Sequence, residues 1–249
     1  MPIRTEIQGR IAEVVIDHPP VNALDSAAWN ELARLVAAVG GNADVRVVLI
    51  RAEGKGFCAG VDLKEMKTFP ERIVELNRGN YLTFEAVRAC EVPVVTAVQG
   101  FVIGGGIGIC GASDVIFAAG DAYFSLPEID RGAMGGAAHL SRMLPLHKVR
   151  AAFFTGAPVP AAEAWRLGAI EKVVPREKLL EEARAFAAVI AAKSRTALRL
   201  AKEALNGIEA VDVDRAYRFE QGLTLEMYLS ADSRKAREAF VEHKGNATF

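Results

Sequence analysis

The sequence has almost no excess of charge of either sign. It contains 30 lysine and arginine residues against 31 aspartate and glutamate residues, so the 249-residue chain has a formal net charge of -1. A strongly basic surface attracts nucleic acids and anionic membranes over long distances, and this composition does not provide one. We therefore expect neither as a partner, and we expect any anionic substrate to be held by local groups.

Cysteine and histidine are scarce and widely spaced. The three cysteines form no CxxC pair and the four histidines form no HExxH-like pair, so the sequence supports neither a disulfide framework nor a metal site. The pattern favours reduced, buried thiols in a cytoplasmic protein. The residues concerned are Cys58, Cys90 and Cys110, and His18, His139, His147 and His243.

Segments that address a protein to a membrane are not evident. The opening MPIRTEIQGRIAEVVIDH alternates charged and apolar residues and lacks the apolar core of a signal peptide. The uncharged stretch 92–113 is by count long enough to cross a bilayer, but Pro93 and six glycines interrupt it. We expect this stretch to be a buried strand followed by a buried helix, and we expect no membrane partner.

Apolar periodicity alternates between strand and helix spacing in the first half of the chain. The first expected helix has Ser26 as its N-cap. Helical patterns dominate from about residue 136, so the sequence predicts an α/β fold with a helical C-terminal part. The expected strands are 10–18, 45–53, 92–100, two within 114–128, and 170–175; the expected helices are 26–39, 70–90, 147–156, 160–169, 175–193, 196–207, 212–229 and 232–243.

The stretch GFVIGGGIGICGASD, residues 100–114, is dense in glycine, which indicates that something comes close to the backbone. Residues 106–111 match the GxGxxG dinucleotide fingerprint, but the helix that follows has room for only about eight residues, and a complete unit needs about thirty. A membrane GxxxG face fails together with the membrane span. Close packing of a helix on a strand and an oxyanion hole are the two alternatives that remain.

The oxyanion hole is the interpretation that fits best. Free backbone N–H groups at the start of a helix can stabilise negative charge on a substrate carbonyl oxygen. A second donor commonly comes from another part of the chain, and GKGFCAGVDLKEM, residues 54–66, also follows a strand in a strand–glycine–helix arrangement.

Five blocks of sequence, taken in order, resemble the enoyl-CoA hydratase/isomerase (crotonase) superfamily over nearly the whole chain. They are PPVNALDSAAWNEL, VRVVLIRAEGKGFCAGVDLKEM, VPVVTAVQGFVIGGG, SDVIFAAGDAYFSLPEIDRGA and FTGAPVPAAEAWRLGAIEKVVP, followed by the closing AFVEHKGNATF. The resemblance implies a crotonase-like spiral of ββα units over 1–190 with an acyl-CoA site, and a helical trimerisation region over 191–249. It also implies a homotrimer or a dimer of trimers. Coenzyme A enters as part of the substrate, and no separate cofactor is expected.

The same resemblance implies roles for individual residues. The thioester oxygen is expected between the backbone N–H groups of Ala59, in FCAGVD, and Gly105, the middle glycine of GGG. Lys244 matches a basic residue that lies near the CoA phosphates in the family, and a solvated terminal lysine is the alternative. The residues expected along the CoA portion are Gly60, Val61, Asp62, Gly104 and Gly106.

One carboxylate of the family's hydratases is absent. Those enzymes carry one glutamate in GGGxE and another in PEI; here the first position is Gly108 and the second is Glu128. Hydration benefits from one group that activates water and another that delivers a proton. A single carboxylate favours isomerisation, hydrolysis or C–C cleavage through an enolate. We expect Glu128 to be the acid and base; a surface charge before a turn is the alternative.

The segment after Glu128 departs further from the hydratase pattern. Arg131 and His139 stand where hydratases have an apolar residue and a glycine, and together they suggest a substrate with an extra polar or anionic group. Structural roles are the alternative, and for His139 this means a buried core histidine. Candidates for closing the pocket, which helix packing explains equally well, are Tyr217, Arg218 and Glu220.

A narrower resemblance rests on NRG, GGGIG, LPEIDRGAMGGAAHLSR and YRFEQG. It points to crotonase-like hydrolases that open the last ring in bacterial steroid catabolism, and it implies retro-Claisen hydrolysis of a β-keto acyl-CoA. Enoyl-CoA hydration or isomerisation is the alternative within the fold. A scaffold or RNA-binding protein is the alternative outside it, and the near-zero net charge disfavours RNA.

Overall fold

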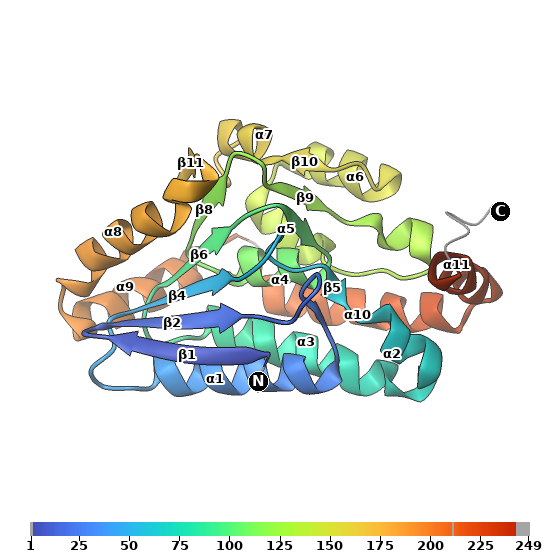
Figure 1. The fold of residues 1–249 in the computed structure, drawn as a ribbon, viewed down its shortest axis with the longest axis horizontal. Helices are drawn as coiled ribbons and strands as arrows, with labels where there is room; N and C mark the ends of the chain where they lie inside the picture. Colours follow the sequence, from blue (N-terminus) through green and yellow to red (C-terminus); the bar gives the residue numbers. More distant parts are fainter. Residues whose placement is uncertain (1, 211, 243–249) are drawn as a thin grey trace.

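The computed structural model describes residues 2–210 and 212–242. Its largest element is a six-stranded sheet with the order β1-β2-β4-β6-β8-β11 (Figure 1). β1 pairs antiparallel with β2, and the other neighbouring pairs of this sheet are parallel. The strands are β1 (Ile3–Gln8), β2 (Ile11–Ile16), β4 (Val47–Ala52), β6 (Val94–Val98), β8 (Val115–Ala119) and β11 (Lys172–Val174).

Short strands form two smaller sheets, with the orders β3-β5 and β10-β9-β7. Three times in succession a strand of the large sheet leads into a short strand and then a helix: β2-β3-α1, β4-β5-α2 and β6-β7-α4. This repeat is the ββα spiral that the resemblance implies, and the fold prediction is confirmed. The short strands are β3 (Ala23–Leu24), β5 (Gly60–Val61), β7 (Phe101–Ile103), β9 (Tyr123–Ser125) and β10 (Val159–Pro160).

Helices pack on both faces of the large sheet and make up most of the chain after β9. The predicted division between residues 190 and 191 falls at the last residue of α8, and the trimerisation of the region beyond it stays a prediction. The helices are α1 (Ser26–Gly40), α2 (Leu63–Thr68), α3 (Ile73–Arg88), α4 (Gly105–Ala112), α5 (Ala137–Met143), α6 (Leu146–Thr155), α7 (Ala161–Arg166), α8 (Leu179–Ala191), α9 (Arg195–Ile208), α10 (Val213–Leu229) and α11 (Ala231–Val241). Three 3-10 turns are η1 (Pro70–Arg72), η2 (Pro127–Arg131) and η3 (Arg176–Lys178).

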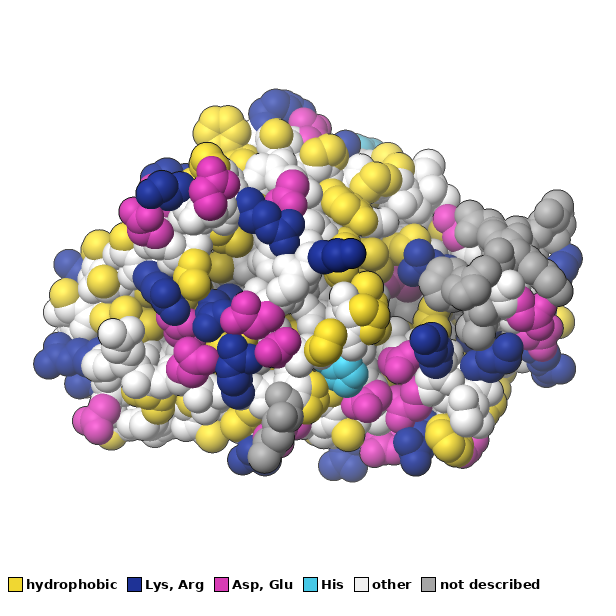
Figure 2. Space-filling view, in the orientation of Figure 1, with side chains coloured by type: hydrophobic (Ala, Val, Ile, Leu, Met, Phe, Trp, Pro, Cys, Tyr) yellow, Lys and Arg dark blue, Asp and Glu magenta, His cyan; other side chains and the backbone are white. Residues whose placement is uncertain are grey.

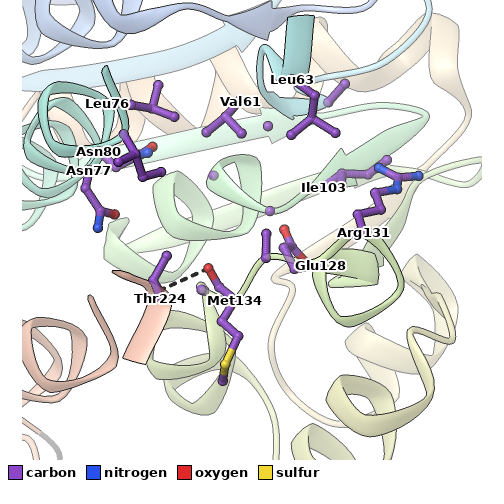
Figure 3. Close-up of a pocket in the computed structure, with 18 of the residues that line it drawn as sticks. Val61, Leu63, Leu76, Asn77, Asn80, Ile103, Glu128, Arg131, Met134 and Thr224 are labelled. Carbon is purple, nitrogen blue, oxygen red and sulfur yellow. Dashed lines mark hydrogen bonds between the residues drawn. The ribbon is translucent and has the colours of Figure 1, made fainter. Parts of the chain in front are cut away.

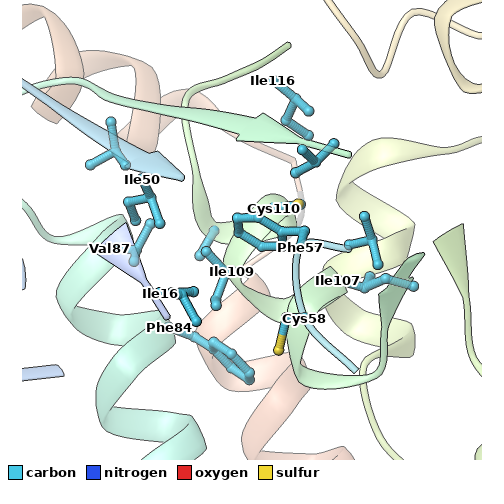
Figure 4. Close-up of a cluster of buried hydrophobic side chains, with 14 of the residues drawn as sticks. Ile16, Ile50, Phe57, Cys58, Phe84, Val87, Ile107, Ile109, Cys110 and Ile116 are labelled. Carbon is cyan, nitrogen blue, oxygen red and sulfur yellow. The ribbon is translucent and has the colours of Figure 1, made fainter. Parts of the chain in front are cut away.

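The inner strands β4, β6 and β8 read as nearly continuous apolar runs because both faces of the sheet are buried there. On β4, Val48 and Ile50 belong to a core that includes side chains of α1 and α3, and Val47 and Leu49 belong to a second core with α8. Figure 4 shows part of the larger core around α4. All three cysteines are buried and free, as the sequence predicts.

The start of α1 differs from the prediction by one residue. Asp25 is the N-cap, and its side chain accepts a hydrogen bond from the Ala28 N–H at 2.8 Å. Ser26 lies inside the helix and donates to Glu65 through its N–H and its hydroxyl. The prediction of Ser26 as N-cap is wrong because Asp25, directly before it, is an equally good cap.

The uncharged stretch 92–113 forms β6, β7 and α4 inside the domain. Within the residues that the structure describes, no helix has the length and apolar character needed to span a bilayer. The face of the molecule in Figure 2 carries basic and acidic side chains intermixed, in line with the balanced composition.

Candidate active site

A cavity lies where β5, the β7–α4 turn, α3, η2 and α10 meet (Figure 3). Its walls are mostly apolar side chains and glycine backbone with a few polar groups, as in sites for small organic ligands. The structure brings together at this cavity eight of the residues singled out from the sequence, which are Ala59, Gly60, Val61, Gly104, Gly105, Glu128, Arg131 and Tyr217.

The β7–α4 turn can be built only with glycine. Gly104, the N-cap of α4, has a φ of +52°, and a Cβ on it would collide with Oε1 of Glu128. A Cβ on Gly105 would lie 2.5 Å from the Trp29 ring. The backbone at the start of α4 therefore faces the cavity without a side chain of its own in the way.

The second glycine turn packs directly on the first. A Cβ on Gly60 would lie 3.2 Å from the carbonyl oxygen of Ile103 and 3.6 Å from the nitrogen of Gly105. The N–H of Ala59 donates to the carbonyl of Asn22 at 3.2 Å. One expected oxyanion donor thus already has a long bond inside the protein.

Asn22 organises the segment that carries Ala59, and sequence reasoning missed it. Its φ is +53°, and its side-chain amide donates to the carbonyls of Glu53 (2.9 Å) and Gly56 (3.0 Å). Asparagine is one of the few residues other than glycine that tolerates this conformation. The asparagine in PPVNAL was the feature of the sequence from which this role could have been predicted.

Asp62 caps α2, because its side chain accepts a hydrogen bond from the Lys64 N–H at 2.8 Å. It also borders a neighbouring hollow that shares Ala59, Val61 and Arg131 with the cavity. The cavity and this hollow are therefore neighbours that share part of their lining.

Gly106 lies on the side of α4 that packs on the core. A Cβ on it would be 3.1 Å from the Cβ and from the carbonyl oxygen of Cys58. Its expected contact with CoA stays a prediction. Lys244 lies outside the described residues.

Glu128, on η2, is the carboxylate of the cavity (Figure 3). Its Oε2 is buried and has no hydrogen-bond partner among the described residues. Burial raises the pKa of this carboxyl to about 8, although its own backbone N–H and the positive charge of Arg131 act in the opposite direction. A group with a pKa near neutrality can both take and return a proton during one reaction.

Arg131 lies beside Glu128 in the wall that the two hollows share (Figure 3). A guanidinium at this point suits an anionic or oxo group of a ligand that spans both hollows. Its place fits the predicted substrate contact, which stays a prediction.

Gly108 on α4, where hydratases carry their other glutamate, faces an aromatic ring. A Cβ at this position would collide with the ring of Phe84 from α3. Phe84 packs edge-on against Trp29, His139 and Tyr217, with ring centroids 5.9, 4.6 and 5.2 Å away. The ring of Phe84 thus occupies the space that a glutamate side chain at position 108 would need.

His139 is buried behind this ring and does not line the cavity. Neither ring nitrogen has a hydrogen-bond partner among the described residues. Burial, with the nearby charges of Arg142 and Arg88, lowers its pKa to about 3, so the ring is neutral. Phe84 and Tyr217 both line the cavity and both contact His139, so its direct contact with a substrate stays a prediction without geometric support.

α10 closes the cavity through hydrogen bonds to the backbone of its two walls. Gln221 donates to the carbonyl of Asn77 on α3 at 2.8 Å, and Thr224 donates to the carbonyl of Met134 at 3.1 Å (Figure 3). Glu220 accepts from the N–H groups of Ala137 and Ala138, at 2.8 and 3.0 Å, and so caps α5.

Of the three predicted closing residues, Tyr217 lines the cavity and Glu220 supports its wall from behind. Arg218 stacks over the Tyr81 ring at 4.8 Å and does not line the cavity. Sequence reasoning missed Asn80 and Phe84 on α3. Their spacing of four residues was the available signal.

Comparisons with known proteins agree with this geometry. A family model described as enoyl-CoA hydratase/isomerase matches residues 6–249. The chain is 51% identical over 234 residues (93% of this chain, 91% of the relative) to a (7aS)-7a-methyl-1,5-dioxo-2,3,5,6,7,7a-hexahydro-1H-indene-carboxyl-CoA hydrolase of Rhodococcus jostii. It is 49% identical over 245 residues (97% and 99%) to a hydrolase of the same name from Mycobacterium tuberculosis. Among solved structures, an enoyl-CoA hydratase/isomerase from Xanthobacter autotrophicus Py2 matches with a TM-score of 0.90 at 26% identity, over 97% of this chain and 93% of that one. The chain belongs to the enoyl-CoA hydratase/isomerase family.

Proposed function

We propose that this protein hydrolyses a C–C bond in the ring of a β-keto acyl-CoA, as the names of its two relatives at about 50% identity suggest. The observation that carries the proposal is a cavity with one carboxylate, Glu128, in which Phe84 fills the space beside Gly108. We place the reaction in the opening of the last ring during bacterial steroid catabolism.

The proposed reaction uses Glu128 and one water. Glu128 takes a proton from the water through its unpartnered Oε2, and the resulting hydroxide attacks a ring ketone. The C–C bond between this ketone and a saturated neighbouring carbon that is conjugated with the thioester then breaks, which leaves a carboxylic acid and an enolate whose charge extends to the thioester oxygen. Glu128 returns its proton to the enolate, so one water is consumed and no other reactant is needed.

The enolate oxygen lies between the N–H groups of Ala59 and Gly105 in this proposal. Such paired donors stabilise charge as it develops, and losing one typically costs about 10²–10³ in rate. In this arrangement the N–H of Ala59 donates both to the substrate oxygen and to the carbonyl oxygen of Asn22, which lies 3.2 Å from the Ala59 nitrogen.

The carrier portion of the substrate occupies the neighbouring hollow. Val61 and Asp62 border it from β5 and the start of α2, and Arg131 stands between it and the acyl cavity. Gly60 and Gly104 leave the wall of the acyl cavity free of side chains at their positions. Coenzyme A belongs to the substrate, and we propose no separate cofactor.

Turnover assays separate this proposal from its alternative. Purified protein is given the 1,5-dioxo indene-carboxyl-CoA named for its relatives and, separately, crotonyl-CoA, and products are read by mass spectrometry. The proposal expects a product heavier than the dioxo substrate by one water, with its ring open, and negligible hydration of crotonyl-CoA. Rapid hydration of crotonyl-CoA with no ring opening would overturn it in favour of enoyl-CoA hydration.

We propose that the protein works in the cytoplasm as a homotrimer or a dimer of trimers. Exposed apolar side chains on the C-terminal helices support self-association, and they include Leu200, Leu205 and Ile208 of α9 and Phe219 of α10. Light scattering after size-exclusion chromatography distinguishes a monomer, a trimer and a hexamer. Cell fractionation tests the compartment.

A further inference from the structure

The side-chain amide of Asn22 is bonded entirely to backbone groups. The residue is 4% exposed. Its Oδ1 accepts a hydrogen bond from the N–H of His18 at 2.7 Å, and its Nδ2 donates to the carbonyls of Glu53 and Gly56 at 2.9 and 3.0 Å. Both N–H donors of the amide are thus used inside the protein, so this side chain holds the path of the chain around it.

These bonds join Asn22 to the segment that ends at Ala59. Glu53 directly follows β4, and Gly56 lies three residues before Ala59. At the end of this segment, the N–H of Ala59 donates to the carbonyl of Asn22 at 3.2 Å. The side chain and the main chain of one residue therefore hold residues 53–59 at three points.

The peptide group between Cys58 and Ala59 is held at both ends. Its carbonyl oxygen accepts the N–H of Ile103 on β7 at 2.9 Å, and its N–H donates to Asn22. Because a peptide group is planar and trans, its C=O and N–H point in opposite directions, and these two bonds together determine how the plane is turned. The N–H of Ala59 keeps its direction only while both partners stay in place.

The two partners of this peptide group have different supports. Ile103 is the last residue of β7, which pairs with β9 and leads into Gly105, the other expected oxyanion donor. Asn22 has a φ of +53°, where residues other than glycine are rarely found. Its side-chain bonds hold it in this conformation. Without them, the link between β2 and β3 is free to relax, and the carbonyl of Asn22 is free to turn away from Ala59.

We propose that Asn22 is a positioning residue of the oxyanion hole. Its amide holds residues 53–59, and its carbonyl holds the N–H of Ala59 in the direction from which it reaches the thioester oxygen. The inference rests on the proposed function, in which Ala59 donates to that oxygen. Asn22 itself borders neither the cavity nor the neighbouring hollow, so it acts through Ala59 and not by touching the substrate.

Two substitutions remove the amide bonds in different ways. Asn22→Gly deletes the side chain and keeps the positive φ accessible, so the chain can still follow its path. Asn22→Asp keeps the acceptor for the His18 N–H and places a carboxylate against the two carbonyls. If Asn22→Asp does not fold, Asn22→Gly is sufficient for the test.

Asp25→Ala is the matched control. It removes the N-cap of α1, three residues further along the chain, and leaves every hydrogen bond of Asn22 in place. An N-cap substitution lowers the stability of the protein, so this variant shows what a loss of stability near Asn22 does by itself.

Both Asn22 variants should lose turnover and keep most of their substrate affinity. On the ring substrate we expect kcat to fall by about 10²-fold, the effect that a misplacement of about 1 Å can have. KM should change little, because the contact with the oxyanion strengthens mainly as charge develops. Asp25→Ala should keep the kcat of the wild type at a temperature where it is folded.

Infrared spectroscopy reports the position of the Ala59 N–H without any turnover. The probe is butyryl-CoA with an isotope label in the thioester carbonyl, bound to each protein. N–H donors polarise this carbonyl, so its stretching frequency should lie below that of free butyryl-CoA in the wild type and in Asp25→Ala. In both Asn22 variants the frequency should return part of the way to the free value.

The two measurements distinguish a failure of the inference from a failure of the proposed function. If the wild type opens no ring substrate, the proposed function fails, and the infrared comparison alone decides the inference. A wild-type frequency in the Asn22 variants would overturn it, and so would an unshifted carbonyl in the wild type itself. The same change of frequency or of kcat in Asp25→Ala would mean that Asn22 acts only through stability.

Discussion

The two turns that lead from a short strand into a helix, β5–α2 and β7–α4, share one plan and differ at the cap. At α2 the side chain of Asp62 accepts a hydrogen bond from the Lys64 N–H at 2.8 Å, so a carboxylate of the protein occupies the positive end of the helix. At α4 the cap is Gly104, which has no side chain to make such a bond. The start of α4 is open to a ligand, and the start of α2 is closed.

Glycine content alone therefore does not make an anion site. Each turn has a glycine with positive φ in it or close to it: Gly60 is the first residue of β5, and Gly104 is the N-cap of α4. The N-cap residue determines whether the first N–H groups of the helix donate hydrogen bonds to the protein itself or can donate to a substrate. The open turn also has the carboxyl of Glu128 against it, and the closed turn borders the neighbouring hollow. Substitutions at the open turn should consequently affect turnover, and those at the closed turn should mainly affect stability and the binding of the carrier portion.

The largest effect is expected for Glu128→Gln, which removes the proton carrier at the open turn. Turnover of the ring substrate should fall by about 10²–10⁴-fold, the usual contribution of a positioned acid or base. The Kd of a non-reactive CoA thioester, measured by calorimetry, serves as the control and should change little. A variant that keeps most of its turnover would show that another group moves the proton.

The pH dependence follows from the same carboxyl. Because the ionised form acts as the base, kcat/KM should rise with pH and level off above about 8, the raised pKa of Glu128. The folded protein holds this proton more tightly than the unfolded chain, whose carboxyl has a pKa of 4.5. Its contribution to stability is thus complete below 4.5 and is lost as the pH rises through 8.

Thermal melts of wild type and Glu128→Gln check that sign. The glutamine cannot ionise, so the variant should gain melting temperature relative to wild type at about pH 9 and not at about pH 4. A gain confined to acid pH would mean that the pKa of Glu128 is lowered in the folded state.

Gly105→Ala tests the open turn directly. The new Cβ would lie 2.5 Å from the Trp29 ring, so the start of α4 must shift and carry its N–H groups away from the substrate oxygen. We expect turnover to fall by about 10²–10³-fold, as for the loss of an oxyanion donor. Gly207→Ala on α9 is the matched control, since a Cβ there meets nothing within 4 Å. Equal turnover in both variants would contradict an oxyanion role for Gly105.

The sequence was sufficient for the parts of the site that depend on local pattern. The strand–glycine–helix turns have local signals, and the error at Ser26 is a shift of one residue between two good caps. The ββα spiral and the carboxylate in LPEID were implied by the resemblance to the family. What the sequence could not supply is contact between distant segments. The ring of Phe84 fills the space beside Gly108, and the amide of Asn80 lies beside Gly105. Both contacts depend on how α3 packs on α4.

Gly108→Glu tests whether a second carboxylate can be placed on α4, at the position where the family's hydratases carry one. Its Cβ would collide with the Phe84 ring, so we expect a loss of about 1–3 kcal/mol in stability, typical of overpacking, and no gain in crotonyl-CoA hydration. The double variant Phe84→Ala with Gly108→Glu should recover part of that stability, because the two positions share one space. Denaturant melts and an enoyl-CoA absorbance assay measure both effects. Strong hydration by the single variant would show that Phe84 does not control this position.

The smallest effect on turnover is expected at the closed turn. Asp62→Ala removes the cap of α2 and should cost about 0.5–2 kcal/mol in stability, as other N-cap substitutions do. Asp62→Asn keeps an acceptor for the Lys64 N–H and should restore most of the loss, which chemical denaturation can measure. Because no N–H of α2 is assigned to the reacting oxygen, kcat on the ring substrate should stay close to that of the wild type in both variants. Asp62→Ala could instead lower kcat as far as Gly105→Ala does while the protein stays folded. That result would mean that both helix starts stabilise the charge on the substrate, and that the difference between their caps does not decide where this charge is stabilised.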